Sequence, residues 1–131
     1  MDPIILASSS PRRQDILKKL RIPFRVVMPN TDETISKSLK NDEIPEFLAR
    51  GKVTSVIKSL PPKQEIQWIL GADTIITMGS NVYGKPQNQE EAFNFIKQFQ
   101  GRSHTVITAI VLYNGKKKTT TSRICKTKVT F

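Results

Sequence analysis

The apolar residues of this chain form short runs whose spacing alternates between strand-like and helix-like. Ile4 to Ala7 is a short apolar run typical of a buried strand, and Phe24 to Met28 and Trp68 to Ala72 are two more. Arg13 to Leu20 and Pro45 to Leu60 instead repeat their apolar residues with a helical period. The first half of the chain therefore predicts alternating strands and helices.

The second half predicts two hairpins joined by a helix. Ile75 to Tyr83 reverses direction at Gly79-Ser80-Asn81, and His104 to Tyr113 runs into the turn signal Asn114-Gly115 before a returning strand over Lys118 to Phe131. Between them, Asn88 is a predicted N-cap with Glu91 three residues on. The helix that follows is marked as amphipathic by Ala92, Phe93, Ile96 and Phe99 and ends at Gly101.

Three predicted helices and several strands, some parallel and some in hairpins, give an α/β fold with a mixed twisted sheet flanked by helices. In the second helix, the residues predicted to share one apolar face are Phe47, Leu48, Val53, Val56, Ile57 and Leu60. The last strand stops at Phe131 and would leave an open edge. Either a partner covers that edge, which predicts a homodimer, or the chain is a shortened version of a longer fold.

At 131 residues the chain corresponds to a single domain, residues 1–131. It has one cysteine, Cys125, no secretory signal and no apolar run of about 18 residues, so we expect a cytoplasmic protein and no membrane. The net charge is +10, but residues 116–131 hold six of the 21 basic residues and none of the 11 acidic ones. Basic residues concentrated there, with few aromatics, favour a solvated surface, and nucleic acid is not expected as a partner.

The stretch Ser8-Ser9-Ser10-Pro11-Arg12-Arg13 joins the first predicted strand to the first helix. Ser10 is a good N-cap and Pro11 suits the first helical position. Free backbone N–H groups, the positive end of the helix dipole, hydroxyls and two guanidinium groups would then meet at one place, which suits a chain of phosphates. The turn alone fits a plain N-cap with two solvated arginines equally well.

Asp73 follows the apolar run Ile69 to Ala72, and a carboxylate at the end of a buried strand lies where α/β sheets place ligands. It could bind a divalent cation or accept a proton from water, or it could only hydrogen-bond its own turn. Lys85, on a stiff turn before Pro86, could contact a phosphate, and Glu33 could be a second metal carboxylate. Lys52 lies on the second predicted helix and contributes only if its face meets the cleft.

His104 is the only histidine, and with one cysteine the chain predicts no zinc site. A partly buried, structural histidine is the interpretation that the pattern favours. Taken together, the cations, the carboxylates and the hydroxyls suit metal-assisted hydrolysis of a phosphoanhydride.

The chain resembles the Maf nucleotide pyrophosphatases in four motifs that come in the right order. These are Leu6-Ala7-Ser8-Ser9-Ser10-Pro11-Arg12-Arg13 before Ile16-Leu17, Leu70-Gly71-Ala72-Asp73-Thr74, Lys85-Pro86, and Gly101-Arg102-Ser103-His104-Thr105-Val106 before Thr108. The resemblance implies an α/β fold with a deep cleft, similar to inosine triphosphatases. It also implies cleavage of nucleoside triphosphates to the monophosphate and pyrophosphate with a divalent cation, Mg²⁺ or Mn²⁺.

By the same resemblance, Asp73 would be the proton acceptor, and Asp73 and Glu33 would bind the metal. The residues implied to line the substrate site are Ser8, Ser10, Arg12, Arg13, Lys52, Thr74 and Lys85. Arg12 and Thr74 match positions tied to substrate choice, and the Ser-Pro-Arg-Arg form is similar to the branch that acts on dTTP and UTP.

The family continues for roughly a further third of its length beyond Val129-Thr130-Phe131, with an Ala-Gly-x-Tyr-x-x-Gln motif that this chain lacks. The domain is therefore expected to be incomplete at its C-terminus. Three hypotheses follow: a nucleoside triphosphate pyrophosphatase for dTTP and UTP, with modified nucleotides as further candidate substrates; a catalytically impaired nucleotide-binding regulator of cell division; and, as the weakest, a nucleic-acid binder acting through residues 116–131.

Overall fold

The computed structural model describes residues 3–31, 39–61, 68–84 and 88–130. The elements in these ranges are β1 (Ile4–Leu6), α1 (Pro11–Lys19), β2 (Phe24–Val26), the 3₁₀ turn η1 (Asn41–Glu43), α2 (Ile44–Ser59), β3 (Trp68–Met78), β4 (Asn81–Tyr83), α3 (Gln89–Phe99), β5 (Ser103–Asn114) and β6 (Thr119–Thr130). Their order confirms the predicted succession of strands and helices.

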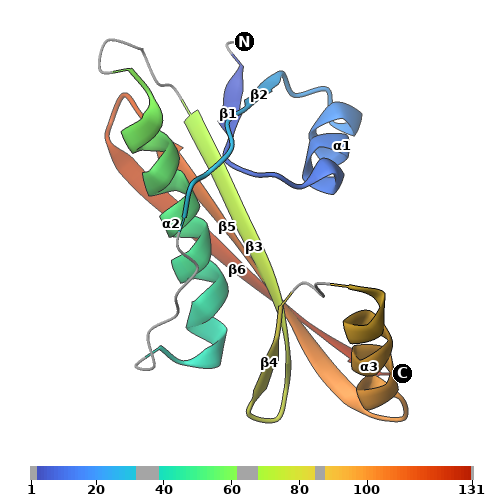
Figure 1. Ribbon diagram of the computed structural model, residues 1–131. Coiled ribbons are helices and arrows are strands. Elements are labelled where there is room, and N and C mark those ends of the chain that lie inside the picture. The colour runs from blue at the N-terminus through green and yellow to red at the C-terminus, as the bar shows by residue number, and fades with distance from the viewer. Residues whose placement is uncertain (1–2, 32–38, 62–67, 85–87, 131) are drawn as a thin grey trace.

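The strands form one mixed sheet in the order β2-β1-β3-β5-β6, with β4 paired to β3 beside this path (Figure 1). β1 runs parallel to both β2 and β3, whereas β5 runs antiparallel to β3 and to β6. The predicted mixed α/β sheet is therefore confirmed. β6 lies at the edge of the path, as the sequence predicted for the last strand.

The helices lie on both faces of the sheet. The crossover through α1 leads from β1 outward to β2, and the crossover through α2 leads back past β1 to β3. Because such crossovers are right-handed, the two opposite directions place α1 and α2 on opposite faces. The third helix, α3, packs through Phe99 against Met78 and Tyr83 at the far end of β3.

The main core lies between α2 and the sheet. Ile5 and Ala7 near β1, Ile69 on β3 and Val111 on β5 pack against a buried stripe of α2. Gly71 permits this close approach, because a Cβ at that position would lie 2.7 Å from Val53 Cγ2 and 2.9 Å from the Ala49 carbonyl oxygen. α2 therefore sits tightly on the middle of β3.

The apolar face of α2 was predicted wrongly in part, and the apolar stripe of α3 is only partly covered. On α2 the buried residues are Ile44, Pro45, Ala49, Val53 and Val56, whereas Phe47 is 44% exposed on the outer side. On α3, Phe99 is buried, but Phe93 and Ile96 are 65% and 54% exposed. Periodicity shows that apolar residues share a stripe, but it does not show how much of the stripe a neighbouring layer covers.

The hairpin between β5 and β6 forms where Asn114-Gly115 predicted it, but its loop is longer than the shortest hairpin turn. Asn114 pairs with Thr119, so residues 115–118 form the loop. The Asn114 side-chain oxygen accepts hydrogen bonds from the backbone N–H groups of Lys116 and Lys117 at 3.1 and 3.3 Å. Lys118 takes the positive φ of 52° that closes the turn.

Candidate active site

The serine-rich turn after β1 is held by its own side chains. Ser8 is 2% exposed, and its Oγ accepts a hydrogen bond from the Ser10 backbone N–H at 3.0 Å and one from Arg13 Nη1 at 3.5 Å. Ser10 is the N-cap of α1, and its Oγ accepts from the Arg13 backbone N–H at 3.4 Å. Pro11 occupies the first turn of the helix, so the predicted cap is confirmed.

This turn presents positive charge at the start of a helix. The N-terminal end of α1 carries the partial positive charge of the helix dipole, and no acidic residue lies in its first turn. Arg12 is exposed and Arg13 is half-buried against Ser8. The turn therefore combines a helix N-terminus, two guanidinium groups and a buried hydroxyl, a combination suited to phosphate oxygens.

An ion pair joins α2 to the middle of the sheet. Lys52 Nζ lies 2.9 Å from Asp73 Oδ1 and also donates to the Ala72 carbonyl oxygen at 3.2 Å. The side chains are 12% and 15% exposed, respectively. The sequence predicted Lys52 as a site residue on the condition that its face of the helix meets the cleft. In the structure, that face of α2 lies against Asp73. The tight packing at Gly71, two residues before Asp73, brings the helix within reach.

The position of Asp73 within its strand differs from the prediction. β3 does not end at Ala72 but continues through Asp73 to Met78, because β5 pairs with it residue by residue from Trp68 to Thr77. The strand that ends near this position is β1, the parallel neighbour of β3. Asp73 therefore lies in the middle of a long strand, just beyond the point where its parallel neighbour stops.

The register of β1 on β3 places the serine turn beside this part of the sheet. Leu6 pairs with Leu70, and the Ala7 backbone N–H donates to the Leu70 carbonyl oxygen at 2.9 Å. Ser8 is the next residue along the chain, so the turn begins alongside the segment of β3 that leads to Asp73. The hydroxyl and arginine cluster and the Lys52–Asp73 pair thus belong to the same region of the fold.

Thr74 does not share the face of Asp73. Successive side chains of a strand point to opposite faces, so Thr74 points away from α2. Its Oγ1 lies 3.0 Å from Thr108 Oγ1, its cross-strand partner on β5. Thr74 therefore lies on the opposite sheet face from Asp73 and Lys52, and its predicted part in substrate binding stays a prediction.

Two further predicted site residues, Glu33 and Lys85, lie outside the described residues. His104 is 6% exposed and its ring stacks on Phe99 with 4.6 Å between ring centroids, so its predicted burial is confirmed.

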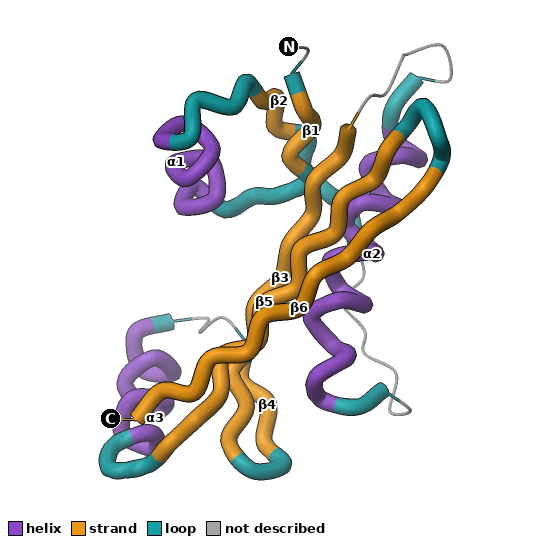
Figure 2. The backbone as a smooth tube through the Cα atoms, turned by 180° about the vertical axis from the view of Figure 1, so that it is seen from behind, coloured by secondary structure: helices purple, strands orange, loops and turns teal. Residues whose placement is uncertain are grey.

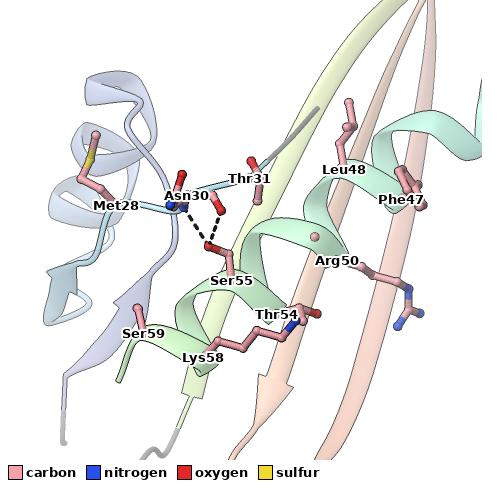
Figure 3. Close-up of a pocket in the computed structure, with 11 residues that line it drawn as sticks. Met28, Asn30, Thr31, Phe47, Leu48, Arg50, Thr54, Ser55, Lys58 and Ser59 are labelled. Carbon is pink, nitrogen blue, oxygen red and sulfur yellow. Dashed lines mark hydrogen bonds between the residues drawn. The ribbon is translucent and has the colours of Figure 1, made fainter. Parts of the chain in front are cut away.

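A hollow of about 680 Å³ lies on the outer side of α2, against the segment that follows β2 (Figure 3). Ser55 anchors that segment: its Oγ accepts from the Asn30 backbone N–H at 2.8 Å and donates to the Asn30 carbonyl oxygen at 3.1 Å. Phe47, Arg50 and Lys58 also line the hollow. Its lining includes neither Asp73 nor the serine turn, so this hollow is not the cleft expected between them.

The part of the chain that the structure describes holds no group of three or more His, Cys, Asp or Glu side chains able to bind a metal ion. At the candidate site, the carboxylate that contacts Lys52 is that of Asp73. None of the described helices is both long enough and apolar enough to cross a lipid bilayer.

The fold is shared with a solved structure. A HAM1 protein from Coxiella burnetii superposes with a TM-score of 0.58 at 18% sequence identity, covering 98% of this chain and 71% of that one. The two proteins thus have the same α/β architecture, a mixed sheet flanked by helices.

The sequence comparison is more specific. A family model described as "Maf-like protein" matches residues 3–131, and the chain belongs to the Maf family. It is 39% identical over 131 residues to the dTTP/UTP pyrophosphatase of Pelotomaculum thermopropionicum and 38% identical over 131 residues to that of Clostridium beijerinckii. Over 115 residues it is 39% identical to the dTTP/UTP pyrophosphatase of Desulforamulus reducens.

These relatives are longer than this chain. The matched region is 66% of the Pelotomaculum protein, 67% of the Clostridium protein and 58% of the Desulforamulus protein, against 100%, 98% and 88% of this chain, respectively. The family is thereby established, and the matched region leaves about a third of the first two relatives and about two fifths of the third unmatched.

Proposed function

We propose that this chain carries the phosphate and metal site of a nucleoside triphosphate pyrophosphatase that hydrolyses dTTP and UTP to the monophosphate and pyrophosphate. The observation that carries the proposal is the Lys52–Asp73 ion pair beside the serine-rich turn at the start of α1. The names of the relatives supply the substrate class. Their 35–39% identity over most of this chain supports proposing the same substrate class for it.

The turn would bind the triphosphate. Backbone N–H groups at the start of α1, together with Arg12 and Arg13, offer several donors and two positive charges to phosphate oxygens. Ser8, held by Arg13 and by the Ser10 N–H, fixes the shape of the turn, and Ser10 caps the helix. Lys85 is proposed as a further phosphate contact on the strength of its motif.

Asp73 would activate the water. Its carboxylate accepts the proton of a water molecule whose oxygen attacks the α-phosphorus; the bond from that phosphorus to the bridging oxygen breaks, and pyrophosphate leaves. Lys52, anchored by the Ala72 carbonyl oxygen as well, holds the carboxylate in one orientation. Its ammonium also offers positive charge to the phosphate oxygens as charge develops on them.

The residues suit a divalent cation that is bound mainly by the phosphate oxygens of the substrate. Mg²⁺ in such sites is held by one or two carboxylates, by phosphate oxygens and by water. Asp73 suits that mode, and we propose Glu33 as the second ligand. The cation, when bound, would neutralise charge on the triphosphate and polarise its phosphorus–oxygen bonds.

Thr74 is left out of this phosphate site, because its hydroxyl pairs with Thr108 on the other face of the sheet. We expect the protein in the cytoplasm, since nucleotides are found there and the single cysteine, Cys125, is an exposed free thiol suited to a reducing compartment.

The test is a product analysis of dTTP, UTP and the other common nucleoside triphosphates with Mg²⁺ or Mn²⁺. We expect pyrophosphate rather than orthophosphate, and in ¹⁸O-labelled water the label enters the monophosphate. Release of orthophosphate, or label in the pyrophosphate, would contradict the proposed chemistry. Nucleotide binding without release of pyrophosphate would favour the alternative function, a nucleotide-binding regulator that lacks catalytic activity.

A further inference from the structure

Ser55 on α2 binds both backbone polar groups of Asn30, a residue 25 positions earlier in the chain. Its Oγ accepts a hydrogen bond from the Asn30 N–H at 2.8 Å and donates one to the Asn30 carbonyl oxygen at 3.1 Å (Figure 3). Asn30 lies beyond the end of β2 at Val26, so the hydroxyl satisfies backbone groups that strand pairing does not. A single side chain therefore ties the segment after β2 to α2.

The Ser55 contact lies next to the ion pair of the candidate active site. Ser55 is three residues beyond Lys52, and residues three apart on a helix are neighbours on its surface. Lys52 contacts Asp73 on β3 at 2.9 Å, whereas Ser55 contacts the segment that follows β2. Neighbouring side chains of one helix thus hold two different parts of the chain.

The serine-rich turn begins between these two parts. β1 lies between β2 and β3, and Figure 2 shows the three strands side by side, with α2 on the far side of the sheet. On one side, the Leu6 carbonyl oxygen accepts from the Val27 N–H at 3.1 Å. On the other side, the Ala7 N–H donates to the Leu70 carbonyl oxygen at 2.9 Å. The turn follows at once, between the segment after β2 and the part of β3 that leads to Asp73.

We call residues 27–31 and 70–73 the flanks of the turn. Ala7, at the end of β1, packs in the buried cluster that α2 forms with the sheet, so the helix lies across the base of the turn. Lys52 ties α2 to the β3 flank by an ion pair, and Ser55 ties it to the other flank by two hydrogen bonds. The helix and its two ties therefore fix the flanks relative to each other.

We propose that Ser55 is a positioning residue, which holds the serine-rich turn in place relative to the Asp73 carboxylate by fixing the Asn30 backbone. The inference rests on the proposed function, in which the turn binds the triphosphate and Asp73 activates the water. A misplacement of about 1 Å between reacting groups can lower a rate by about 100-fold, so a tie that fixes the flanks matters for turnover. Ser55 acts through Asn30 and not on the substrate.

Amide hydrogen exchange tests the inference without any nucleotide. Ser55→Ala removes both hydrogen bonds to Asn30, so the Asn30 amide should exchange at least about fivefold faster. The Ser10 amide, which donates to Ser8 Oγ inside the turn, should also exchange at least about twofold faster, because the flank beside the turn is released. Ser55→Thr keeps the hydroxyl and should restore both rates.

Two controls separate this effect from a general loss of stability. Ser59→Ala removes a hydroxyl one turn further along α2, which donates to the Val56 carbonyl oxygen at 3.0 Å within the helix, and should change neither rate. The Glu91 amide, which donates to Asn88 Oδ1 at the start of α3, is the internal reference and should exchange equally in all variants. Melting curves establish that each variant remains folded.

Pyrophosphate release from dTTP with Mg²⁺ provides the kinetic test. Ser55→Ala should lower kcat by about fivefold to tenfold and change KM by less than about twofold, because the phosphate donors remain but their alignment with Asp73 is lost. Ser55→Thr and Ser59→Ala should match the wild-type chain.

Three results would overturn the inference: equal exchange of the Asn30 amide in the wild-type chain and Ser55→Ala, unchanged exchange of the Ser10 amide, or an equal loss of kcat in Ser59→Ala. A wild-type chain that releases no pyrophosphate would instead contradict the proposed function. The exchange rates would then still decide whether Ser55 holds the turn.

Discussion

The Lys52 ammonium lies 2.9 Å from a carboxylate oxygen of Asp73, and the two residues come from different layers of the fold, helix α2 and strand β3. The pair is largely shielded from water, at 12% and 15% side-chain exposure. A charge pair in such a position restrains both side chains and links the packing of α2 to the geometry of the candidate active site.

Removing one partner of this pair should reduce stability. Lys52→Met keeps the length of the side chain but leaves the Asp73 carboxylate without its ammonium, which we expect to cost about 1–3 kcal/mol. A double-mutant cycle with Asp73→Asn, measured by urea unfolding, should give a coupling free energy of about 0.5–3 kcal/mol. Lys58→Met, on the outer side of the same helix, is the control, and a coupling near zero would show that the pair does not form.

Gly71 should not tolerate alanine. The added Cβ would lie 2.7 Å from Val53 Cγ2 and 2.9 Å from the Ala49 carbonyl oxygen, so α2 would have to move, at a cost of about 1–3 kcal/mol. Gly51→Ala is the matched control, because a Cβ there meets nothing within 4 Å and lies inside a helix. It should raise stability by about 1 kcal/mol. Thermal unfolding of the two variants measures both effects, and equal shifts would contradict the close packing of α2 on β3.

The N-cap hydrogen bond of α1 should make a measurable contribution to the free energy of unfolding. Ser10→Ala removes the hydrogen bond that the Arg13 N–H donates to the serine hydroxyl and should destabilise the protein by about 1 kcal/mol. Ser9→Ala, at an exposed position one residue earlier, should change stability by less than about 0.5 kcal/mol. If Ser9→Ala cost as much as Ser10→Ala, Ser10 would not be the N-cap.

Asp42 should titrate at lower pH in the folded protein than in the unfolded chain. Lys126 on β6 donates a hydrogen bond of 3.0 Å to Asp42, and its ammonium lowers the pKa of that carboxyl below the ordinary value of 3.8. The ion pair therefore favours the folded state above about pH 4, and this contribution is lost as the pH falls through the folded pKa. An NMR titration of the Asp42 carboxyl carbon measures the pKa. Lys126→Ala should return it toward 3.8, and an unchanged pKa in that variant would contradict the contact.

The local features of the fold could be predicted from the sequence because their causes are local. Ser10 and Pro11 at the start of α1, Asn88 accepting from the Glu91 N–H at 2.8 Å, and the reversal near Asn114 depend on residues close together in the chain. What failed depended on distant neighbours. The continuation of β3 through Asp73 is imposed by pairing with β5. Phe93 is exposed because the described elements leave its side of α3 uncovered.

The candidate site was predicted by residue type but not by arrangement. Ser8, Arg13 and Asp73 could be selected from motifs and Lys52 from the family resemblance. The Lys52–Asp73 contact, however, needed the close approach of α2 at Gly71, for which a glycine in a buried strand is only a weak signal. Thr74 was grouped with Asp73 by the family resemblance, which does not show that adjacent residues of a strand point to opposite faces of the sheet. Glu33 and Lys85 remain predictions.

The central claim, that Asp73 activates water beside a phosphate-binding turn, is tested most directly by pyrophosphate release from dTTP with Mg²⁺ by the wild-type chain and Asp73→Asn. Asparagine keeps a side-chain oxygen to accept from Lys52 but is not a general base, so the variant should fold and bind the nucleotide while turnover falls by about 10²–10⁴-fold. Turnover by Asp73→Asn at the wild-type rate would contradict the claim.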